Sequence, residues 1–453
     1  MGRTLETRIT RLALSALSVG LLLGGCGGCG GSGDGGNGED QLNLLLISLD
    51  TLRADRLGCY GYDRDTSPAL DAFAERSVRF RYAIAPSPWT VPSHVSLLTG
   101  LLPSTHGVHT SVQVPGDDTD LLAELLFPRG WYTFGITDGG NVSGSLGFDR
   151  GFRAFYDVDK SFSTTVREAQ TYMADRQPFG AWFAFLHTYD IHCPYDPPEP
   201  YRSMFETEGA QSADIDGKCG NPWLNEMDLS PEQVQYISDR YDGGIREVDD
   251  TLAKLFKSLE ESGAMENTVI VITSDHGEEF KEHGQIGHER SLHRELLEVP
   301  LIIYAPGLEP GVVDSPVSLV DVMPTVLELL GEAIPEGLDG RSLLPLIEGT
   351  AEPATGQPAT LRWQLALDAW WTVDSQVIVN QQAKRVSYFD VTVDPLAQVD
   401  RAGEEREKAE ARMADLRASL ARGRKRQPGL RGSLSESEAA TLRGLGYADA
   451  QAR

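Results

Sequence analysis

The feature that most constrains the fold is a pair of continuous apolar runs that each lead into acidic residues. "LNLLLISLD", residues 42–50, ends at Asp50, and "TVIVITSDHGEEF", residues 268–280, passes from its apolar run into Asp275 and His276. Such runs are typical of strands that are buried on both faces of a parallel sheet. Ligands bind at the carboxyl ends of parallel strands in open α/β sheets, so these side chains are expected to share one site.

Between these runs and beyond them, strand patterns alternate with helix patterns. We expect further strands over residues 131–137, 181–187 and 299–306, and helices over residues 66–77, 92–100, 231–262 and 320–331. This alternation predicts an α/β fold with a mostly parallel, doubly wound sheet flanked by helices.

After about residue 350 the pattern changes. Residues 359–380 and 385–395 predict short strands of an antiparallel meander, and residues 404–426 predict a highly charged helix that packs weakly. The chain is therefore expected to contain a catalytic α/β domain over residues 42–350 and a small C-terminal subdomain, antiparallel β plus a charged helical tail, over residues 351–453.

The N-terminal segment resembles a bacterial lipoprotein signal. An apolar run over residues 12–23 follows three arginines and is shorter than a confident membrane span, which is typical of a signal-peptide core. It ends in "LGGC", which resembles a lipobox, so residues 1–25 are expected to be removed and Cys26 to be lipidated. The Gly-rich residues 26–41 then predict a flexible tether. The alternative is an ordinary signal peptide followed by a stray cysteine.

These features place the protein in the bacterial cell envelope. Gly27, directly after the lipidated cysteine, resembles the signal for sorting to the outer membrane, where the protein would face the periplasm or the cell surface. The formal net charge of −27 makes nucleic acid an unsuitable partner, because its phosphates would be repelled. The membrane is thus expected as a partner through the N-terminal lipid alone, and the sequence leaves the oligomeric state undetermined.

Export also permits disulfide bonds. Cys193 and Cys219 flank a polar, Pro-rich segment that they are able to close as a loop, although both can equally be free thiols. Cys59 is expected to be a small buried hydrophobic residue.

A candidate nucleophile lies in "PSPWTVPSHVSLLTG", residues 86–100, where Thr90 precedes an apolar helical run. Together with Asp50, Asp275 and His276 it forms a plausible site for one divalent cation, which is able to lower the pKa of a hydroxyl and so create an alkoxide. The helix start adds free N–H groups and a positive dipole potential that suit an oxyanion, and Pro92 fits the first turn. The alternative is that Thr90 is only a helix cap and that the acids are structural.

Four ordered segments resemble the sulfatase family of the alkaline phosphatase superfamily. They are "ISLDTLRADRLGCYGY", "APSPWTVPSHVSLLTGLLPSTHGV", "HTYDIHCPYDPP" and "TSDHGEEFKEHGQIGH", and the resemblance covers about residues 43–350. It implies that Asp50, Asp275 and His276 are ligands of a divalent metal ion (Ca, Mn, Zn or Mg) and that Thr90 is a nucleophile that also contacts the metal.

The resemblance also assigns roles to several histidines. His192 falls on a histidine that contacts the substrate anion or assists the leaving group, and His288 falls on a basic residue that binds the transferred group. His94 occupies the place of an arginine that stabilises the nucleophile. His187, His283 and His293 are read as ordinary structural histidines, with His283 open to either reading.

The chain also departs from the family pattern. Sulfatases carry Cys or Ser in C/S-x-P-x-R and oxidise it to formylglycine, whereas this chain has threonine at position 90, which cannot give that aldehyde. Thr51 stands where a second acid commonly follows the first metal ligand, so that ligand is lost or replaced by water. Threonine nucleophiles in the superfamily belong to phosphodiesterases and phosphoglycerol transferases.

The sequence therefore predicts a metal-dependent hydrolase of phosphate or sulfate esters with Thr90 as the nucleophile and a preference for phosphoesters. Three alternatives stay open: a sulfuric ester hydrolase that works without formylglycine, a transferase of phospho-head-groups, and a catalytically silent binding protein of the envelope.

Overall fold

A computed structural model of the chain describes residues 41–158, 161–176, 180–210, 228–362, 364–432 and 436–445. The expected signal peptide, the lipidation site Cys26, most of the tether, and Cys219 lie outside the described residues. Within the described part of the chain, no helix combines the length and the hydrophobicity that crossing a bilayer requires.

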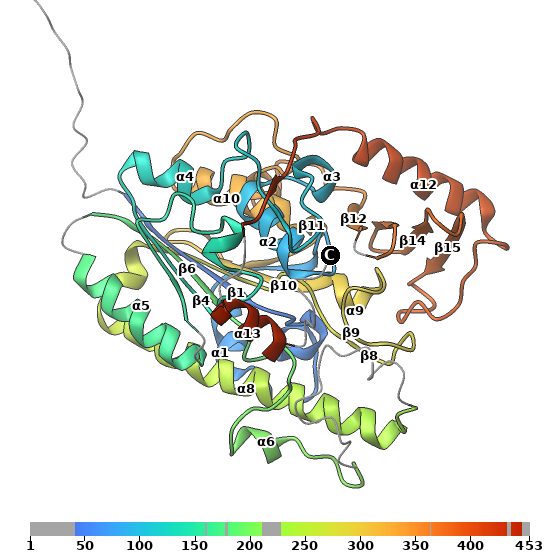
Figure 1. Ribbon diagram of the computed structural model, residues 1–453, viewed down its shortest axis with the longest axis horizontal. Coiled ribbons are helices and arrows are strands. Elements are labelled where there is room, and N and C mark those ends of the chain that lie inside the picture. Colours follow the sequence, from blue (N-terminus) through green and yellow to red (C-terminus); the bar gives the residue numbers. More distant parts are fainter. Residues whose placement is uncertain are drawn as a thin grey trace, which may run out of the picture. The chain divides into compact units, whose positions relative to one another are not determined.

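The centre of the fold is an eight-stranded sheet in the order β11-β2-β10-β7-β1-β6-β4-β5 (Figure 1). Its strands are, in chain order, β1 (Asn43–Leu49), β2 (Val78–Ile84), β4 (Tyr132–Thr137), β5 (Ala154–Asp157), β6 (Trp182–Thr188), β7 (Thr268–Thr273), β10 (Glu298–Tyr304) and β11 (Gly311–Ser318). Every pairing is parallel except the two that β10 makes with β2 and β7. The carboxyl ends of β7, β1, β6 and β4 therefore meet along one edge.

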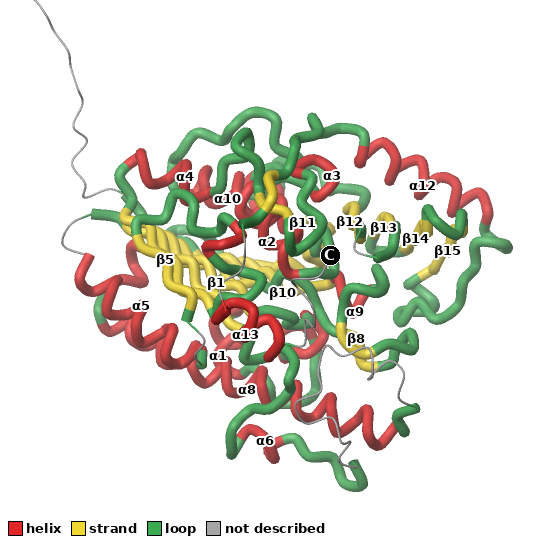
Figure 2. The backbone as a smooth tube through the Cα atoms, viewed as in Figure 1, coloured by secondary structure: helices red, strands yellow, loops and turns green. Residues whose placement is uncertain are grey.

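Helices cover both faces of this sheet (Figures 1 and 2). One face packs against α2 (Thr90–Thr99), α4 (Leu122–Leu126) and α10 (Val322–Leu329), and the other against α1 (Pro68–Ala74), α5 (Phe162–Arg176) and α8 (Pro231–Glu261). The predicted doubly wound α/β architecture is confirmed.

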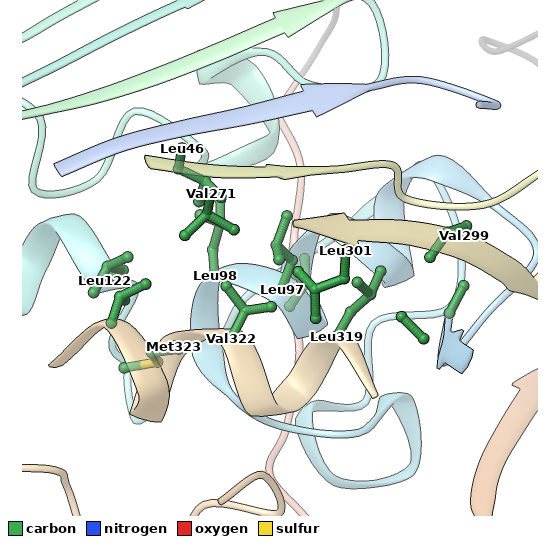
Figure 3. Packing of buried hydrophobic residues seen from close by; sticks show 14 of the residues in the cluster. Leu46, Leu97, Leu98, Leu122, Val271, Val299, Leu301, Leu319, Val322 and Met323 are labelled. Carbon is green, nitrogen blue, oxygen red and sulfur yellow. The ribbon is translucent and has the colours of Figure 1, made fainter. Parts of the chain in front are cut away.

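The two hydrophobic cores follow from the alternation of side chains along β1. Leu44 and Leu46 belong to the cluster under α2 and α10, whereas Leu45 and Ile47 belong to the cluster under α1 and α8. Figure 3 shows Leu46 in the first cluster, beside Val271 and above the side chains of α2 and α10. Burial on both faces explains why the sequence of this strand is continuously apolar.

The C-terminal meander is also confirmed. It is a four-stranded antiparallel sheet in the order β12-β13-β14-β15, formed by β12 (Gln357–Leu361), β13 (Leu367–Trp371), β14 (Ser375–Asn380) and β15 (Arg385–Asp390). The charged helix, α12 (Arg406–Leu420), is shorter than residues 404–426. Leu416 of this helix packs on Trp370 and Val377, so it is better anchored than its composition indicates.

Shorter elements complete the described fold. They are α3 (Pro103–His106), α6 (Tyr201–Met204), α9 (Arg294–Leu297), α11 (Leu344–Ile347), α13 (Glu436–Gly444), β3 (Gln113–Val114), β8 (Glu279–Phe280), β9 (Ile286–Gly287), β16 (Gly429–Leu430), and 3-10 turns at Ala54–Arg56, Gly58–Tyr60, Phe127–Arg129, Gly144–Leu146, Ala264–Asn267 and Leu319–Asp321.

Sequence patterns missed β2, β5, β11 and α5. The segment of β2, "VRFRYAI", interrupts its apolar residues with the half-buried Arg79 and the exposed Arg81. The strand predicted within residues 268–280 is also shorter than that range, because β7 ends at Thr273 and Glu279–Phe280 form the separate strand β8. Asp275 and His276 thus lie in the loop after β7, at the expected edge.

Candidate active site

Thr90 is the first residue of α2, and its side chain is completely buried. Its hydroxyl oxygen lies 3.3 Å from Nε2 of His276. The residue preceding the helix, Trp89, is extended and supplies no side-chain cap, and Pro92 needs no N–H in the first turn. The reading of Thr90 as a simple helix cap is therefore not supported, because its hydroxyl faces a ring nitrogen on another loop.

Asp50 and Asp275 come from the ends of the neighbouring strands β1 and β7 and are both fully buried. Oδ1 of Asp50 has no hydrogen-bond partner among the described residues, and neither has Oδ2 of Asp275. Oδ1 of Asp275 accepts a hydrogen bond from the backbone N–H of Thr51 at 3.3 Å. Each carboxylate thus keeps one unsatisfied oxygen in a buried site, which is costly unless a cation binds there.

The same conclusion follows from the electrostatics of these carboxyls. Burial raises the pKa of Asp50 well above its usual value, and the neighbouring Asp275 and Glu278 raise it further. Burial also raises the pKa of Asp275, against the opposing effect of His94. Two buried carboxylates that destabilise each other's charged form are the arrangement that a bound divalent cation stabilises.

His276 presents a lone pair to the same point. Its Nδ1 lies 2.9 Å from the carbonyl oxygen of Gly277, which can only accept, so Nδ1 carries the proton and Nε2 does not. Nε2 lies 3.2 Å from Oδ2 of Asp275. Burial and, to a smaller extent, the neighbouring His288 together lower the pKa of His276 to about 3, so the ring is neutral. Ligand atoms of Asp50, Asp275 and His276 all lie within 4.8 Å of one another.

His94 lies beneath the site and supports it from inside α2. Its Nδ1 donates to the carbonyl oxygen of Thr90 at 2.9 Å, and its Nε2 lies 2.9 Å from the hydroxyl of Ser48 on β1. Both ring nitrogens are thereby used within the fold, and burial keeps the pKa of His94 below its ordinary value. His94 therefore positions Thr90, and neither of its ring nitrogens is left to bind a substrate.

His187 lies at the site although the sequence pattern indicated an ordinary structural residue. Its Nε2 is 3.2 Å from Oδ2 of Asp50, and both side chains are completely buried. The register of β6 against β1 explains the contact, because His187 pairs with Ser48 two residues before Asp50. The signal available in the sequence was its place at the carboxyl end of a predicted strand.

His192 and His288 form a second group of rings beside His276. The ring centroid of His288 lies 4.5 Å from that of His276 and 5.1 Å from that of His192. Burial lowers the pKa of His192 and of His288 to about 3. The two histidines predicted to contact the substrate are therefore brought together with the candidate metal ligands, and both are neutral at ordinary pH.

Glu278 was not singled out from the sequence, yet it orients His288. One carboxylate oxygen of this fully buried residue lies 2.9 Å from Nδ1 of His288. This contact engages Nδ1 of His288 and so fixes the orientation of its ring. Its position two residues after His276 is the signal that the sequence offered.

Outside this site, the cysteine predictions have mixed outcomes. Cys193 is disulfide-bonded, while its predicted partner, Cys219, lies outside the described residues, so the pairing stays a prediction. Cys59 is a free thiol and only half-buried.

The comparison with known proteins assigns the family. The Sulfatase family model matches residues 42–332, which is more than half of the chain. The chain belongs to the sulfatase family. The resemblance of the four ordered motifs is thereby confirmed, as is the expectation of a sulfatase-like ester hydrolase.

The relatives include proteins named as sulfatases and one named as a multifunctional alkaline phosphatase superfamily protein. The chain is 31% identical over 246 residues to the multifunctional alkaline phosphatase superfamily protein PehA of Trinickia caryophylli, a match that covers 46% of this chain and 45% of PehA. It is 25% identical over 393 residues to the ulvan-active sulfatase of Formosa agariphila, covering 76% of this chain and 72% of that protein.

Solved structures agree with the family fold. The phosphonate monoester hydrolase of Agrobacterium radiobacter superposes with a TM-score of 0.69 at 20% sequence identity, covering 87% of this chain and all of that chain. This sulfatase-family protein thus shares the architecture of phosphonate hydrolases as well as that of sulfatases.

Proposed function

We propose that this sulfatase-family protein is a metal-dependent phosphoesterase in which Thr90 is the nucleophile. The observation that carries the proposal is the convergence of four groups in one buried region: the hydroxyl of Thr90, one carboxylate oxygen from each of Asp50 and Asp275, and Nε2 of His276. A catalytically silent binding protein has no need of two buried carboxylates, each with one unsatisfied oxygen, beside a hydroxyl.

Asp50, Asp275 and His276 would hold the cation, with the Thr90 oxygen completing the set. Mixed carboxylate and imidazole ligands suit divalent ions between hard and borderline, which leaves Ca, Mn, Zn and Mg as candidates. When bound, the ion lowers the pKa of the hydroxyl and offsets the negative charge of the carboxylates.

The residues of the chain then divide the remaining work. Oγ1 of Thr90 forms a bond to phosphorus while the bond from phosphorus to the leaving oxygen breaks, giving a phosphothreonine and an alcohol. The first turn of α2 directs backbone N–H groups toward the incoming anion. His192 and His288 contact the anion and assist the leaving oxygen, and water or an acceptor hydroxyl then cleaves the phosphothreonine. The acceptor distinguishes a hydrolase from a head-group transferase.

The charge of the site favours esters that carry a single negative charge. His276, His192 and His288 are neutral, and among the described residues no Lys or Arg side chain forms a hydrogen bond or ion pair with Thr90 or the candidate ligands. The nearby Arg53 donates its hydrogen bonds to Asp55, Glu282 and the carbonyl oxygen of Glu278. Its positive charge is therefore paired with these acidic side chains. One divalent cation beside two carboxylates leaves little positive charge for a dianionic phosphate monoester. We infer that phosphodiesters and phosphonate monoesters are the better substrates.

Sulfate esters are the second candidate substrates, because they also carry a single charge and several relatives are named sulfatases. A formylglycine hydrate expels sulfate by collapsing to an aldehyde. A sulfothreonine lacks that route and must wait for water to attack sulfur. This chain therefore loses the advantage that formylglycine gives to sulfatases, and phosphoester cleavage is expected to exceed sulfate release.

The test is a panel of chromogenic esters that share one leaving group: an aryl phosphodiester, phosphonate monoester, phosphate monoester and sulfate, each with Ca²⁺, Mn²⁺, Zn²⁺ or Mg²⁺. The expected order places the phosphodiester and the phosphonate first. Fastest turnover of the phosphate monoester would contradict the charge argument, and turnover of the sulfate alone would contradict the preference for phosphorus.

We also propose that Cys26 carries a lipid anchor that holds this enzyme on the cell envelope. The support is the "LGGC" segment after a short apolar run. Cys26→Ser is expected to block processing or to release the protein from membranes. A correctly cleaved mutant in the membrane fraction would show that the cysteine has another role.

A further inference from the structure

Asn141 is a buried amide that the fold itself does not use. The residue is 1% exposed, and neither its Nδ2 nor its Oδ1 has a hydrogen-bond partner among the described residues. A primary amide without any partner is rare in a protein interior, because its loss of water is not compensated. The usual explanation for such a group is a bound water, ion or ligand.

The position of Asn141 points to the active site. It lies in the loop after β4, and β4 runs parallel to β6, which in turn runs parallel to β1. The loops after these three strands therefore lie at the same edge of the sheet, and they carry Asn141, His192 and Asp50, respectively.

Tyr189 connects Asn141 to the histidines of the site. Its hydroxyl accepts a hydrogen bond from the backbone N–H of Asn141 at 3.1 Å. The ring of Tyr189 lies 4.5 Å from that of His187 and 5.4 Å from that of His192, between ring centroids. The side chain of Tyr189 thus lies between Asn141 and two histidines of the site. His187 contacts Asp50, and His192 is proposed to contact the substrate.

Two glycines set the backbone conformation around Asn141. Gly139 and Gly140 precede it with φ values of 71° and 61°, a left-handed conformation that residues with a side chain rarely adopt. A Cβ atom at Gly140 would also meet the Tyr189 ring at 3.3 Å. Asn141 thereby lies within a tight turn over residues 139–142, which is closed by the hydrogen bond from the N–H of Val142 to the carbonyl oxygen of Gly139.

We propose that Asn141 binds the phosphoryl or sulfuryl group of the substrate, with Nδ2 donating to an oxygen that stays on the transferred group. The inference rests on the proposed function and extends it. It assigns the Asn141 amide as a neutral hydrogen-bond donor to the transferred group, in a site whose ligands and nucleophile have no Lys or Arg partner among the described residues. A neutral amide binds a singly charged group without adding the positive charge that would favour a dianion.

The test compares Asn141→Leu with Asn43→Leu, two removals of a buried amide of equal size. Asn43 is a matched control because its amide is used by the fold: Nδ2 donates to Thr268 and Oδ1 accepts from the N–H of Trp182. Binding of two anions that are singly charged near pH 7, dimethyl phosphate and vanadate, to the metal-loaded protein is measured by calorimetry, and thermal unfolding is measured for each variant.

Asn141→Leu is expected to weaken anion binding by about tenfold or more while its unfolding midpoint stays within about 2 °C of the wild type. Asn43→Leu is expected to show the reverse pattern. Asn141→Asp keeps the size of the side chain and adds a negative charge, so it is expected to weaken anion binding more than Asn141→Leu does. It replaces the leucine variant in the test if that variant does not fold.

Unchanged anion binding in Asn141→Leu overturns the proposal, and so does a joint loss of stability and binding that matches the control pattern. Repeating the binding measurements in a Thr90→Ala background separates this inference from the proposed function. Anion binding that depends on Asn141 there supports the inference whether or not Thr90 proves to be the nucleophile.

Discussion

The hydroxyl oxygen of Thr90 lies 3.3 Å from Nε2 of His276, and this is its only hydrogen-bonding contact among the described residues. The two residues come from different elements, the start of α2 and the loop after β7. Because Nδ1 of His276 is occupied by the carbonyl oxygen of Gly277, Nε2 offers a lone pair to the region where the hydroxyl and two carboxylates also meet.

This contact predicts separate effects on turnover and on stability when Thr90 is changed. Thr90→Ala is expected to lower kcat by about 10³-fold or more, the scale seen when a covalent nucleophile is removed, while Thr90→Ser keeps a good part of it. Thr99→Ala in the same helix is the control, because its hydroxyl bonds only to the carbonyl oxygen of Val95. Steady-state kinetics on the best ester decides. Near-wild-type kcat in folded, metal-loaded Thr90→Ala would rule out this nucleophile.

The two buried carboxylates predict opposite effects of Asp275→Asn with and without metal. In metal-free protein the substitution removes one of two mutually repelling groups, so the variant is expected to unfold at a higher temperature than the wild type. At a hundredfold excess of metal over its Kd, the wild type is expected to gain about 2.7 kcal/mol of stability and the variant little. Metal analysis and thermal unfolding with and without chelator test this. Full metal occupancy in Asp275→Asn would show that the ligand assignment is wrong.

The backbone of Thr51 predicts a strain effect next to the site. Thr51 has a φ of 61°, which is unusual for a β-branched residue, and its N–H donates to Asp275 while its hydroxyl donates to the carbonyl oxygen of Asp50. Thr51→Asn is expected to be at least about 1 kcal/mol more stable than Thr51→Val, because asparagine tolerates this conformation and valine keeps the strain without the hydroxyl. Equal stability of the two variants in chemical denaturation would indicate that the strain is not significant.

The pKa of Glu279 predicts how stability changes with pH. Burial raises this pKa from 4.5 to about 7, and one of its oxygens has no partner among the described residues. A carboxyl whose pKa is raised by folding contributes stability that is present below its unfolded pKa and is lost as the pH rises through the folded value. Glu279→Gln keeps the acceptor for the N–H groups of His283 and Gln285, so it removes this loss.

Glu279→Gln is therefore expected to match the wild type near pH 4.5 and to exceed it by about 2 to 3 kcal/mol above pH 8. Denaturant unfolding across this pH range measures the difference, with the exposed Glu266→Gln as the control. A constant difference at every pH would contradict the assigned pKa.

The sequence determined the layers of the fold, because a strand that is buried on both faces must be apolar at every consecutive position. That pattern can be recognised within a few neighbouring residues. β1 and β7 were predicted from uninterrupted apolar residues, and α8 from its helical period. The same reasoning missed β2, where the solvent-facing arginines hide the pattern. The sequence also predicted Asp50, Asp275, His276 and Thr90 as one candidate site. These residues follow predicted strands or begin a predicted helix, and they lie in motifs whose order resembles that of the family.

Only the tertiary structure decided what each of these groups contacts. His94 proved to be occupied at both nitrogens by Thr90 and Ser48, and His187 proved to lie against Asp50. The contacts of His94 with Ser48 and of His187 with Asp50 could not be predicted from neighbouring residues, because they join positions 46 and 137 residues apart and depend on strand register and helix placement. The isolation of the Asn141 amide is likewise a property of its surroundings, because a buried group is known to lack a partner only when every neighbouring segment is in place.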